Sequence, residues 1–276
     1  MSTYHVVLTR FNVRRGQQID PRALSDIWLD ARMRLFLDIT VPSLAAQIRR
    51  PDQWLVFFDD NTPDKIRTLF EALRAKHLSL TNILRAEYCT ELTTDECARR
   101  IVSLAPEGTD WLLTTRLDND DALHPHFIET VNRLCRPGVR EFINPTRGLI
   151  VAGPRLYRKR DFSSPFISCS EPLSDCRTVW VDQHQRLARH GLVRQFGLRD
   201  AWIQVVHGGN LANQVRGVRA CPSSVASGVM PDALAAAVMP LSMSDHLLDN
   251  SFGLTRRYIG SAVRRVRRMW NDRRAG

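Results

Sequence analysis

The stretch that decides the fold is "QWLVFFDDNTPDKIRTLFEALRAK", residues 53–76. Its first seven residues form an apolar run of strand length, and residues 64–76 carry apolar side chains at helical spacing. Thr62 and Pro63 stand between the two, which predicts Thr62 as the N-cap of the helix and Pro63 as its first residue. A strand followed directly by a helix is the repeating unit of a parallel sheet with helical crossovers.

The same alternation of strand and helix continues on both sides of this unit. Strand-like runs and segments of helical period alternate through residue 135: 4–11 and 23–50, 53–59 and 64–76, 80–86 and 93–104, 110–118 and 124–135. "TTDE" at 93–96 has the form of a capping box. Beyond residue 136, strand-like runs within 140–159 predict an antiparallel extension, a helix is expected at 178–190 and a short strand at 201–206. We therefore expect an α/β fold with a mostly parallel sheet flanked by helices.

Composition limits the class of protein. The 276 residues are 43% hydrophobic, which is enough for a globular core. No secretion-type leader follows Met1 and no run of about 18 apolar residues occurs, so we expect a cytoplasmic protein, with peripheral contact to the inner membrane face as an extension of that expectation. The six cysteines have no zinc-type spacing and are expected to be reduced.

Three regions are expected along the chain. Residues 1–221 carry the α/β pattern, residues 222–254 are rich in small residues and proline and predict a loop or linker, and residues 255–276 form a basic amphipathic tail. The tail holds eight Arg and one Asp, and apolar residues recur in it at helical spacing. This pattern predicts a helix that contacts an anionic membrane, and a solvated terminus is an equal alternative. Nucleic acid is not an expected partner, because the rest of the chain has no basic stripe or binding motif.

The clearest chemical signal is an acidic turn in "TTRLDNDDALHPHF", residues 114–127. Ligands of parallel sheets bind at the carboxyl ends of strands, and this turn follows such an end directly. Asp118 and Asp120 alternate across an Asn, so both can converge on a divalent cation, Mn²⁺ or Mg²⁺, that leaves positions open for a pyrophosphate. Asp121 would support these ligands or cap the next helix. The alternative is a plain cluster of turn and N-cap residues.

Four segments resemble the nucleotide-sugar glycosyltransferases of the GT-A fold, family 2 type: "HVVLTRFN" (5–12), "VPSLAAQ" (41–47), "WLVFFDDNTPD" (54–64) and "LDNDDALHPHF" (117–127). With "TVWVDQHQRL" (178–187) and "WIQVVHGGNLAN" (202–213), the chain also resembles the bacterial "putative rhamnosyltransferase" family over roughly residues 4 to 217. The resemblance implies a metal-dependent glycosyltransferase that moves a sugar from a nucleoside diphosphate donor to a glycan or lipid-linked acceptor, with inversion. If the family name holds, the sugar is rhamnose.

The resemblance also implies roles for individual residues. Asp118 and Asp120 would hold the metal and the diphosphate, and Asp182 would deprotonate the acceptor hydroxyl opposite the leaving nucleotide. The alternative for Asp182 is an ion pair with Arg186, one helical turn further on. Glu171 and Asp175 are reserve bases.

The nucleotide pocket is expected at the ends of the first strands. Asp59 or Asp60 would bind the nucleoside base, although both also fit a solvated turn, and Arg10 and Asn12 would line the same pocket. Arg116 lies in an otherwise apolar strand and needs a partner, either the diphosphate or one of the aspartates beside it.

A late histidine completes the expected site. His207 follows the strand 201–206 and precedes two glycines, so its imidazole can reach the metal or the diphosphate, or be hydrogen-bonded in the core. Asn210 and Asn213 are weaker candidates. Three tryptophans could stack on sugar rings or fill the core: Trp28, Trp180 and Trp202.

Two other functions compete with glycosyl transfer. A nucleotidyltransferase would also place paired aspartates at a strand end, but "RFNVRRGQQ" (10–18) is a poor version of its triphosphate loop. A non-catalytic carbohydrate-binding protein would need neither a cation nor a base.

Overall fold

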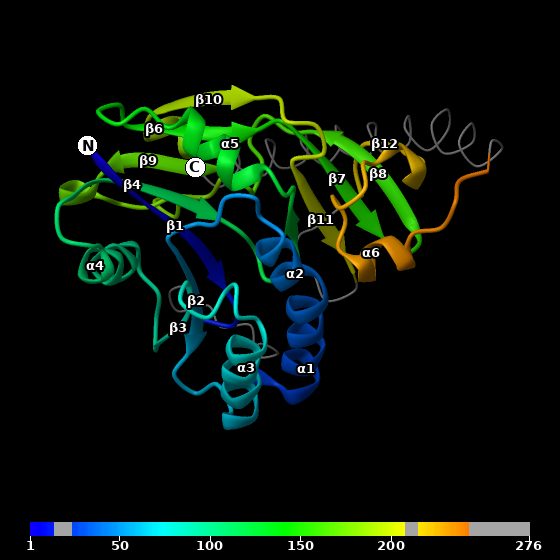
Figure 1. Cartoon of the computed structure of the whole chain (residues 1–276), viewed down its shortest axis with the longest axis horizontal. Helices are drawn as coiled ribbons and strands as arrows, with labels where there is room; N and C mark the ends of the chain where they lie inside the picture. The colour runs from blue at the N-terminus through cyan, green and yellow to red at the C-terminus, as the bar shows by residue number, and fades with distance from the viewer. Residues whose placement is uncertain (14–23, 208–214, 243–276) are drawn as a thin grey trace, which may run out of the picture.

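The computed structural model describes residues 1–13, 24–207 and 215–242. Within these residues the strands form two sheets, drawn in Figure 1. The first has the order β10-β6-β9-β4-β1-β2-β3 and the second has the order β12-β8-β7-β11-β5. The strands of the first sheet are β1 (Ser2–Arg10), β2 (Gln53–Asp59), β3 (Leu84–Cys89), β4 (Thr109–Arg116), β6 (Glu141–Pro145), β9 (Ser168–Pro172) and β10 (Leu192–Phe196). Those of the second are β5 (Ala122–Leu123), β7 (Arg147–Ala152), β8 (Arg155–Arg160), β11 (Trp202–Val206) and β12 (Val218–Arg219).

The centre of the first sheet is parallel, as the alternation of strand and helix predicts. β1 pairs in parallel with β2 and β4, and β2 pairs in parallel with β3. β9 then runs antiparallel to both β4 and β6. The expected fold class, a mostly parallel sheet flanked by helices with an antiparallel extension, is confirmed.

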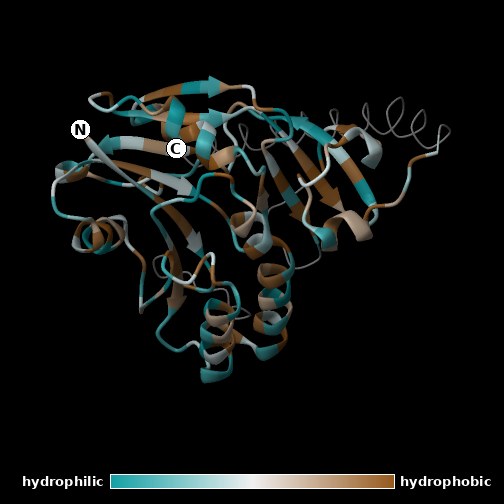
Figure 2. Ribbon diagram, in the orientation of Figure 1, coloured by the Kyte–Doolittle hydropathy of each residue, from teal (hydrophilic) through white to brown (hydrophobic). Residues whose placement is uncertain are grey.

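Helices cover both faces of this sheet (Figure 1). In chain order they are α1 (Asp26–Leu35), α2 (Val41–Ala45), α3 (Asp64–Lys76), α4 (Thr94–Leu104), α5 (Phe127–Leu134) and α6 (Asp232–Ala237). α1 and α2 lie in the segment of helical period at 23–50, and a π-helical turn, Phe36–Thr40, joins them. In Figure 2 apolar colour lies on the strands and on the helices that pack against them, with polar stretches on both.

The apolar periods of the sequence explain which helix faces are buried. In α3 the buried residues are Ile66, Phe70 and Leu73, and they join Trp54 and Phe58 of β2 in one core cluster. Each such side chain contributes about 1.5–3 kcal/mol when fully buried. α4 places Cys97 and Ile101 on the opposite face of the sheet.

The two predicted helix starts differ in outcome. At α4 the N-cap is confirmed, since the Thr93 hydroxyl accepts the Glu96 N–H at 3.1 Å, whereas the Glu96 carboxylate pairs with Arg99 and Arg100 instead of closing the capping box. At α3 it is wrong: the helix begins at Asp64 after Pro63, with no side-chain cap. The Thr62 hydroxyl is instead hydrogen-bonded to the side chain of Asn12, so a tertiary contact has replaced the predicted N-cap bond.

The helix expected at 178–190 is also wrong. This segment is a series of turns with one short 3-10 helix, Leu187–Arg189. Thr178 has φ +64°, a left-handed conformation that an α-helix does not accommodate. The backbone N–H groups of Thr178 and Val179 are donated to Glu171 and to the hydroxyl of Thr114. These bonds tie the start of the segment to β9 and β4 and hold Thr178 in its non-helical conformation.

The segment 222–242 contains more structure than a loop. It holds a 3-10 turn, Pro222–Ser224, and α6, and it buries Val229, Leu234 and Val238. Leu234 and Val238 join the core cluster of the second sheet. Residues 243–254 and the basic tail at 255–276 lie outside the described residues. Among the described helices, none has the length and apolarity needed to cross a membrane.

Candidate functional site

The acidic turn lies where the two sheets meet. β4 ends at Arg116 in the first sheet, and after the turn β5 pairs with β11 of the second sheet. Asp121 fixes this junction, because its Oδ1 accepts the Val205 N–H at 2.9 Å. Burial and the neighbouring aspartates raise the pKa of Asp121 well above its ordinary value. Asp121 therefore supports the turn and does not cap α5, whose N-cap position is His126.

Arg116 pairs with Asp118, one of the two partners expected for it inside the protein. Its Nη2 lies 2.8 Å from Asp118 Oδ2, and its Nε lies 3.3 Å from Asp118 Oδ1. Burial alone would raise the pKa of Asp118, but the guanidinium of Arg116 holds it below its ordinary value. Asp118 is therefore an anion at neutral pH.

Asp120 is 3% exposed and is bound by two residues from distant parts of the chain. Its Oδ2 lies 2.5 Å from Nη1 of Arg32 in α1 and 3.0 Å from Nε2 of His207 at the end of β11. The Arg32 guanidinium also lies 4.9 Å from the centre of the Trp28 ring. The structure thus brings together Asp118, Asp120 and His207 around one turn.

The ends of β1 and β2 meet beside this turn. The Asn119 side chain donates to Phe11 O at 2.9 Å, which ties the acidic turn to the residues that follow β1. Asn12 Oδ1 accepts the Asp59 N–H at 3.1 Å, so the candidate nucleotide residues of β1 and β2 are in contact. Asp59 is fully buried, and its Oδ1 accepts from the backbone and side chain of Asn61.

Asp60, the other candidate for the nucleoside base, is arranged differently. It is exposed, and its Oδ2 accepts the hydroxyl of Thr90, which follows β3. Its carbonyl accepts from Arg67 of α3. Asp59 is thus tied to Asn12 through its backbone and to Asn61 through its side chain, whereas the Asp60 carboxylate is bonded to Thr90 on the β3 side of the sheet edge.

The loop that carries Asp182 crosses the same edge. The Arg10 guanidinium lies 4.1 Å from the centre of the Trp180 ring, and His184 Nδ1 lies 3.4 Å from Arg116 Nη1. Asp182 pairs with His190, at 3.0 Å between Oδ2 and Nε2, and not with Arg186, the alternative partner suggested by the sequence. The hydrogen bond from His190 lowers the pKa of Asp182, which is therefore ionised at neutral pH.

The reserve bases are less favourable. Glu171 is 2% exposed, its carboxylate accepts the N–H groups of Arg177 and Thr178, and burial raises its pKa. Asp175 pairs with Arg140 on the surface. Of the tryptophans, Trp202 is a core residue, fully buried with its ring stacked on Phe166 at 4.9 Å. Asn210 and Asn213 lie outside the described residues.

Two site residues were missed by sequence reasoning, Arg32 and His184. Arg32 lies in α1, 88 positions before its partner Asp120. Nothing in the sequence around it distinguishes it from other arginines on a helix. His184 stands two residues after Asp182. A histidine in this polar run was the sequence signal that could have identified it as a site residue. Burial lowers the pKa of His184 to about 4, so its imidazole is neutral at pH 7.

The donor atoms of the turn suit a hard cation that shares its coordination sphere with a substrate. In the described part of the chain, no three His, Cys, Asp or Glu side chains form a complete metal site. Mg²⁺, however, is often held by one or two carboxylates and completed by phosphate oxygens and water. Asp118 and Asp120 fit that pattern, provided that Arg116 yields an oxygen of Asp118.

A family described as "Putative rhamnosyl transferase" matches residues 21–219. Because the match covers most of the sequence, the chain belongs to this family, and so to the glycosyltransferases. The family resemblance stated from the motifs is confirmed, and with it the GT-A-like class of the fold. No curated protein matches the sequence.

Among solved structures, the chain is similar to S. aureus TarS, with 12% identity and a TM-score of 0.40, over 75% of this chain and 37% of TarS. It is also similar to a putative nucleotide-diphospho-sugar transferase from Desulfovibrio desulfuricans G20, with 12% identity and a TM-score of 0.36, over 75% and 83% of the two chains. The inositol-1-phosphate CTP transferase from T. maritima matches with 11% identity and a TM-score of 0.40, over 77% and 93%.

Proposed function

We propose that this protein transfers a sugar, rhamnose in the first instance, from a nucleoside diphosphate donor to a glycan or lipid-linked acceptor, with a divalent cation at the acidic turn. The observation that carries the proposal is the contact between His207 and Asp120, 3.0 Å apart although 87 positions separate them. It joins two residues chosen independently from the sequence, at the carboxyl end of β4 where ligands of such sheets bind.

Asp118 and Asp120 would hold Mn²⁺ or Mg²⁺, and the cation would neutralise charge on the departing diphosphate. The protein itself adds positive charge at the same place through Arg116 and Arg32. Guanidinium groups bind phosphate oxygens in pairs, so Arg116 can exchange its bonds to Asp118 for bonds to a diphosphate.

The nucleoside would lie toward β1 and β2. Asp59 is fixed by Asn12 and Asn61, and a fixed carboxylate is a specific acceptor for N–H groups of a base. Arg10, stacked on Trp180, brings a further cation to the end of β1.

Asp182 would act as the base that takes the acceptor proton. Its side chain is partly accessible and its low pKa keeps it ionised, so it can accept a proton as the bond to the leaving nucleotide breaks. His190 orients the carboxylate, and the contact from His184 to Arg116 holds the loop beside the turn. Attack from this side would invert the anomeric carbon.

The test is turnover of a panel of dTDP-, UDP- and GDP-sugars with and without Mn²⁺ or Mg²⁺. We expect metal-dependent release of nucleoside diphosphate from one donor, dTDP-rhamnose, and a loss of about 10²–10⁴-fold in Asp120→Asn. The Asn variant retains an oxygen acceptor for Arg32, and Asp64→Asn, on the exposed start of α3, is the matched control.

Asp182→Asn separates the base from the donor site. Donor binding should be unchanged, whereas transfer to an acceptor should fall by about 10²–10⁴-fold. Asp175→Asn is the control. Release of pyrophosphate from a nucleoside triphosphate would instead identify a nucleotidyltransferase, and activity unaffected by Asp120→Asn would disprove the role of the turn.

A further inference from the structure

The second sheet carries a cavity of about 670 Å³ whose walls are strongly basic. The lining includes six cationic residues, Arg147, Arg158, Lys159, Arg160, Arg199 and Arg216, against two acidic residues, Asp161 and Asp200. None of these residues has a role in the proposed transfer reaction. The cavity therefore needs an explanation of its own.

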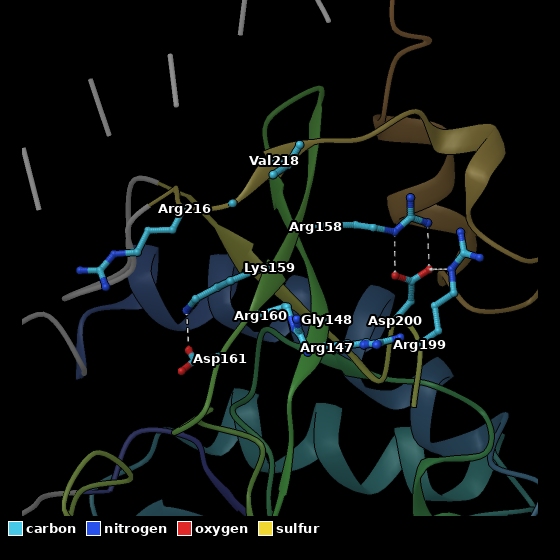
Figure 3. A pocket seen from close by; sticks show the side chains of 11 residues that line it. Arg147, Gly148, Arg158, Lys159, Arg160, Asp161, Arg199, Asp200, Arg216 and Val218 are labelled. Atoms are coloured by element: carbon cyan, nitrogen blue, oxygen red, sulfur yellow. Dashed lines mark hydrogen bonds and ion pairs between the residues drawn. The ribbon is translucent and has the colours of Figure 1, made fainter. Parts of the chain in front are cut away.

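Strand alternation sorts these cations onto two sides of β8. Lys159 points to one side and pairs with Asp161 at 2.6 Å, as Figure 3 shows. Arg158 and Arg160 share the other side with Arg147, because Arg147 stands directly opposite Arg160 in the antiparallel pair of β7 and β8. Arg199 approaches this side from the turn before β11, and both it and Arg158 are directed at Asp200 in Figure 3. We call Arg147, Arg158, Arg160 and Arg199 the arginine face.

The arginine face carries more positive charge than its own carboxylate can balance. Arg158 makes two bonds of 3.1 Å to Asp200 and is further held by Ser224. Arg199 lies 3.7 Å from the same carboxylate. Among the described residues, neither Arg147 nor Arg160 forms an ion pair, and both are exposed. Like charges in directly opposite positions destabilise a strand pair, and a bound anion would remove that repulsion.

The arginine face is separate from the donor site. The Ala201 N–H donates to Arg147 O at 2.9 Å, which places this cavity at the start of β11, whereas His207 follows the end of that strand. Six residues of extended chain span roughly 20 Å. A diphosphate bound at the acidic turn cannot therefore reach Arg147 and Arg160, and the arginine face requires a different phosphate group.

We propose that the arginine face binds a phosphate group, with Arg158 held in place by Asp200 and Ser224 and with Arg147 and Arg160 as the forks that bind its oxygens. Guanidinium forks match the spacing of phosphate oxygens and bind them through charge-assisted hydrogen bonds. The phosphate can belong to a soluble phosphorylated compound or to a lipid headgroup, and the two sources are separated by experiment.

The first arm measures binding of inorganic pyrophosphate by calorimetry in EDTA, which removes any divalent metal ion from the acidic turn. Arg147→Ala/Arg160→Ala should weaken binding about 100-fold, because each lost guanidinium is expected to cost about tenfold. Arg133→Ala/Arg155→Ala removes two exposed arginines that do not line the cavity and should bind like the wild type. Weakening confined to Arg147→Ala/Arg160→Ala locates the probe at the arginine face rather than at the acidic turn, which keeps this test independent of the proposed transfer activity.

The second arm measures co-sedimentation with vesicles of phosphatidylglycerol, with phosphatidylcholine vesicles as reference. Loss of sedimentation in Arg147→Ala/Arg160→Ala but not in the control pair would support a lipid headgroup as the source. Loss of pyrophosphate binding with sedimentation unchanged would support a soluble phosphate compound. Equal weakening in both double variants, or no binding of either probe by the wild type, would overturn the proposal.

Discussion

The two ends of β11 differ in how their charges are balanced. At its end, the acidic turn contains buried aspartates, and Asp118 and Asp120 each contact an arginine. At its start, the arginine face is exposed, and two of its four arginines form no ion pair within the described residues. Buried charges are stable only when they are paired, whereas exposed cations can be left for a ligand. The difference indicates that the turn is preorganised by the fold and that the arginine face is completed by what binds to it.

The largest expected effect breaks the pairing at the turn. Arg32→Ala leaves Asp120 buried without its guanidinium, and we expect a loss of about 3–5 kcal/mol in the free energy of unfolding. Urea denaturation measures it, and Arg34→Ala on the exposed side of α1 should change stability by less than about 0.5 kcal/mol. Arg32→Ala/Asp120→Asn should lose less than the sum of its single variants. A loss equal to that of Arg34→Ala would contradict a buried, paired turn.

A smaller effect on stability is expected at another buried carboxylate, Glu141, and its dependence on pH tests whether that carboxylate is paired. Glu141 is fully buried between Arg136 and Arg194; burial alone would raise its pKa, but the two guanidinium groups hold it below its ordinary value. A carboxyl with a depressed pKa stabilises the fold above the pKa of the unfolded chain and loses that contribution as pH falls through the folded value. Glu141→Gln should therefore cost about 1–3 kcal/mol at pH 7 and progressively less below about pH 4.

The measurement is urea denaturation of both proteins from pH 7 to pH 3. Glu129→Gln is the control, because Glu129 is an exposed carboxyl on α5 that pairs with His126 just before the helix. Its free energy of unfolding should differ little from that of the wild type at any pH. A stability difference for Glu141→Gln that grows as pH falls would reverse the assigned direction of the pKa shift.

The smallest effect belongs to the arginine face. Arg147→Ala or Arg160→Ala removes one of two opposed cations, so without ligand each variant should be as stable as the wild type or more stable by a few tenths of a kcal/mol. Thermal unfolding in phosphate-free buffer measures this change. A loss of more than about 1 kcal/mol in either variant would mean that the arginines hold the fold together, and the contrast between the two ends of β11 would disappear.

Much of the fold followed from local pattern. The strands β1, β2 and β4 and the helices α3, α4 and α5 lie where the apolar periods predict them, within a few residues. Pattern failed where tertiary contacts hold a non-helical backbone, as at Thr178 with its φ of +64°, and where a cap was exchanged for a tertiary contact, as at Thr62. It also could not reveal α6, because its helical residues follow a stretch rich in proline and serine.

The sequence by itself determined the order of strands and helices and the place of the acidic turn after β4, since both depend on residues near one another in the chain. The tertiary structure decided which cation meets which carboxylate. Arg32 reaches Asp120 from 88 positions away and His207 reaches it from 87, whereas Arg147 and Arg160 meet across a hairpin without a carboxylate between them. Charge pairing depends on distance in space and on burial, and neither is encoded by position along the chain.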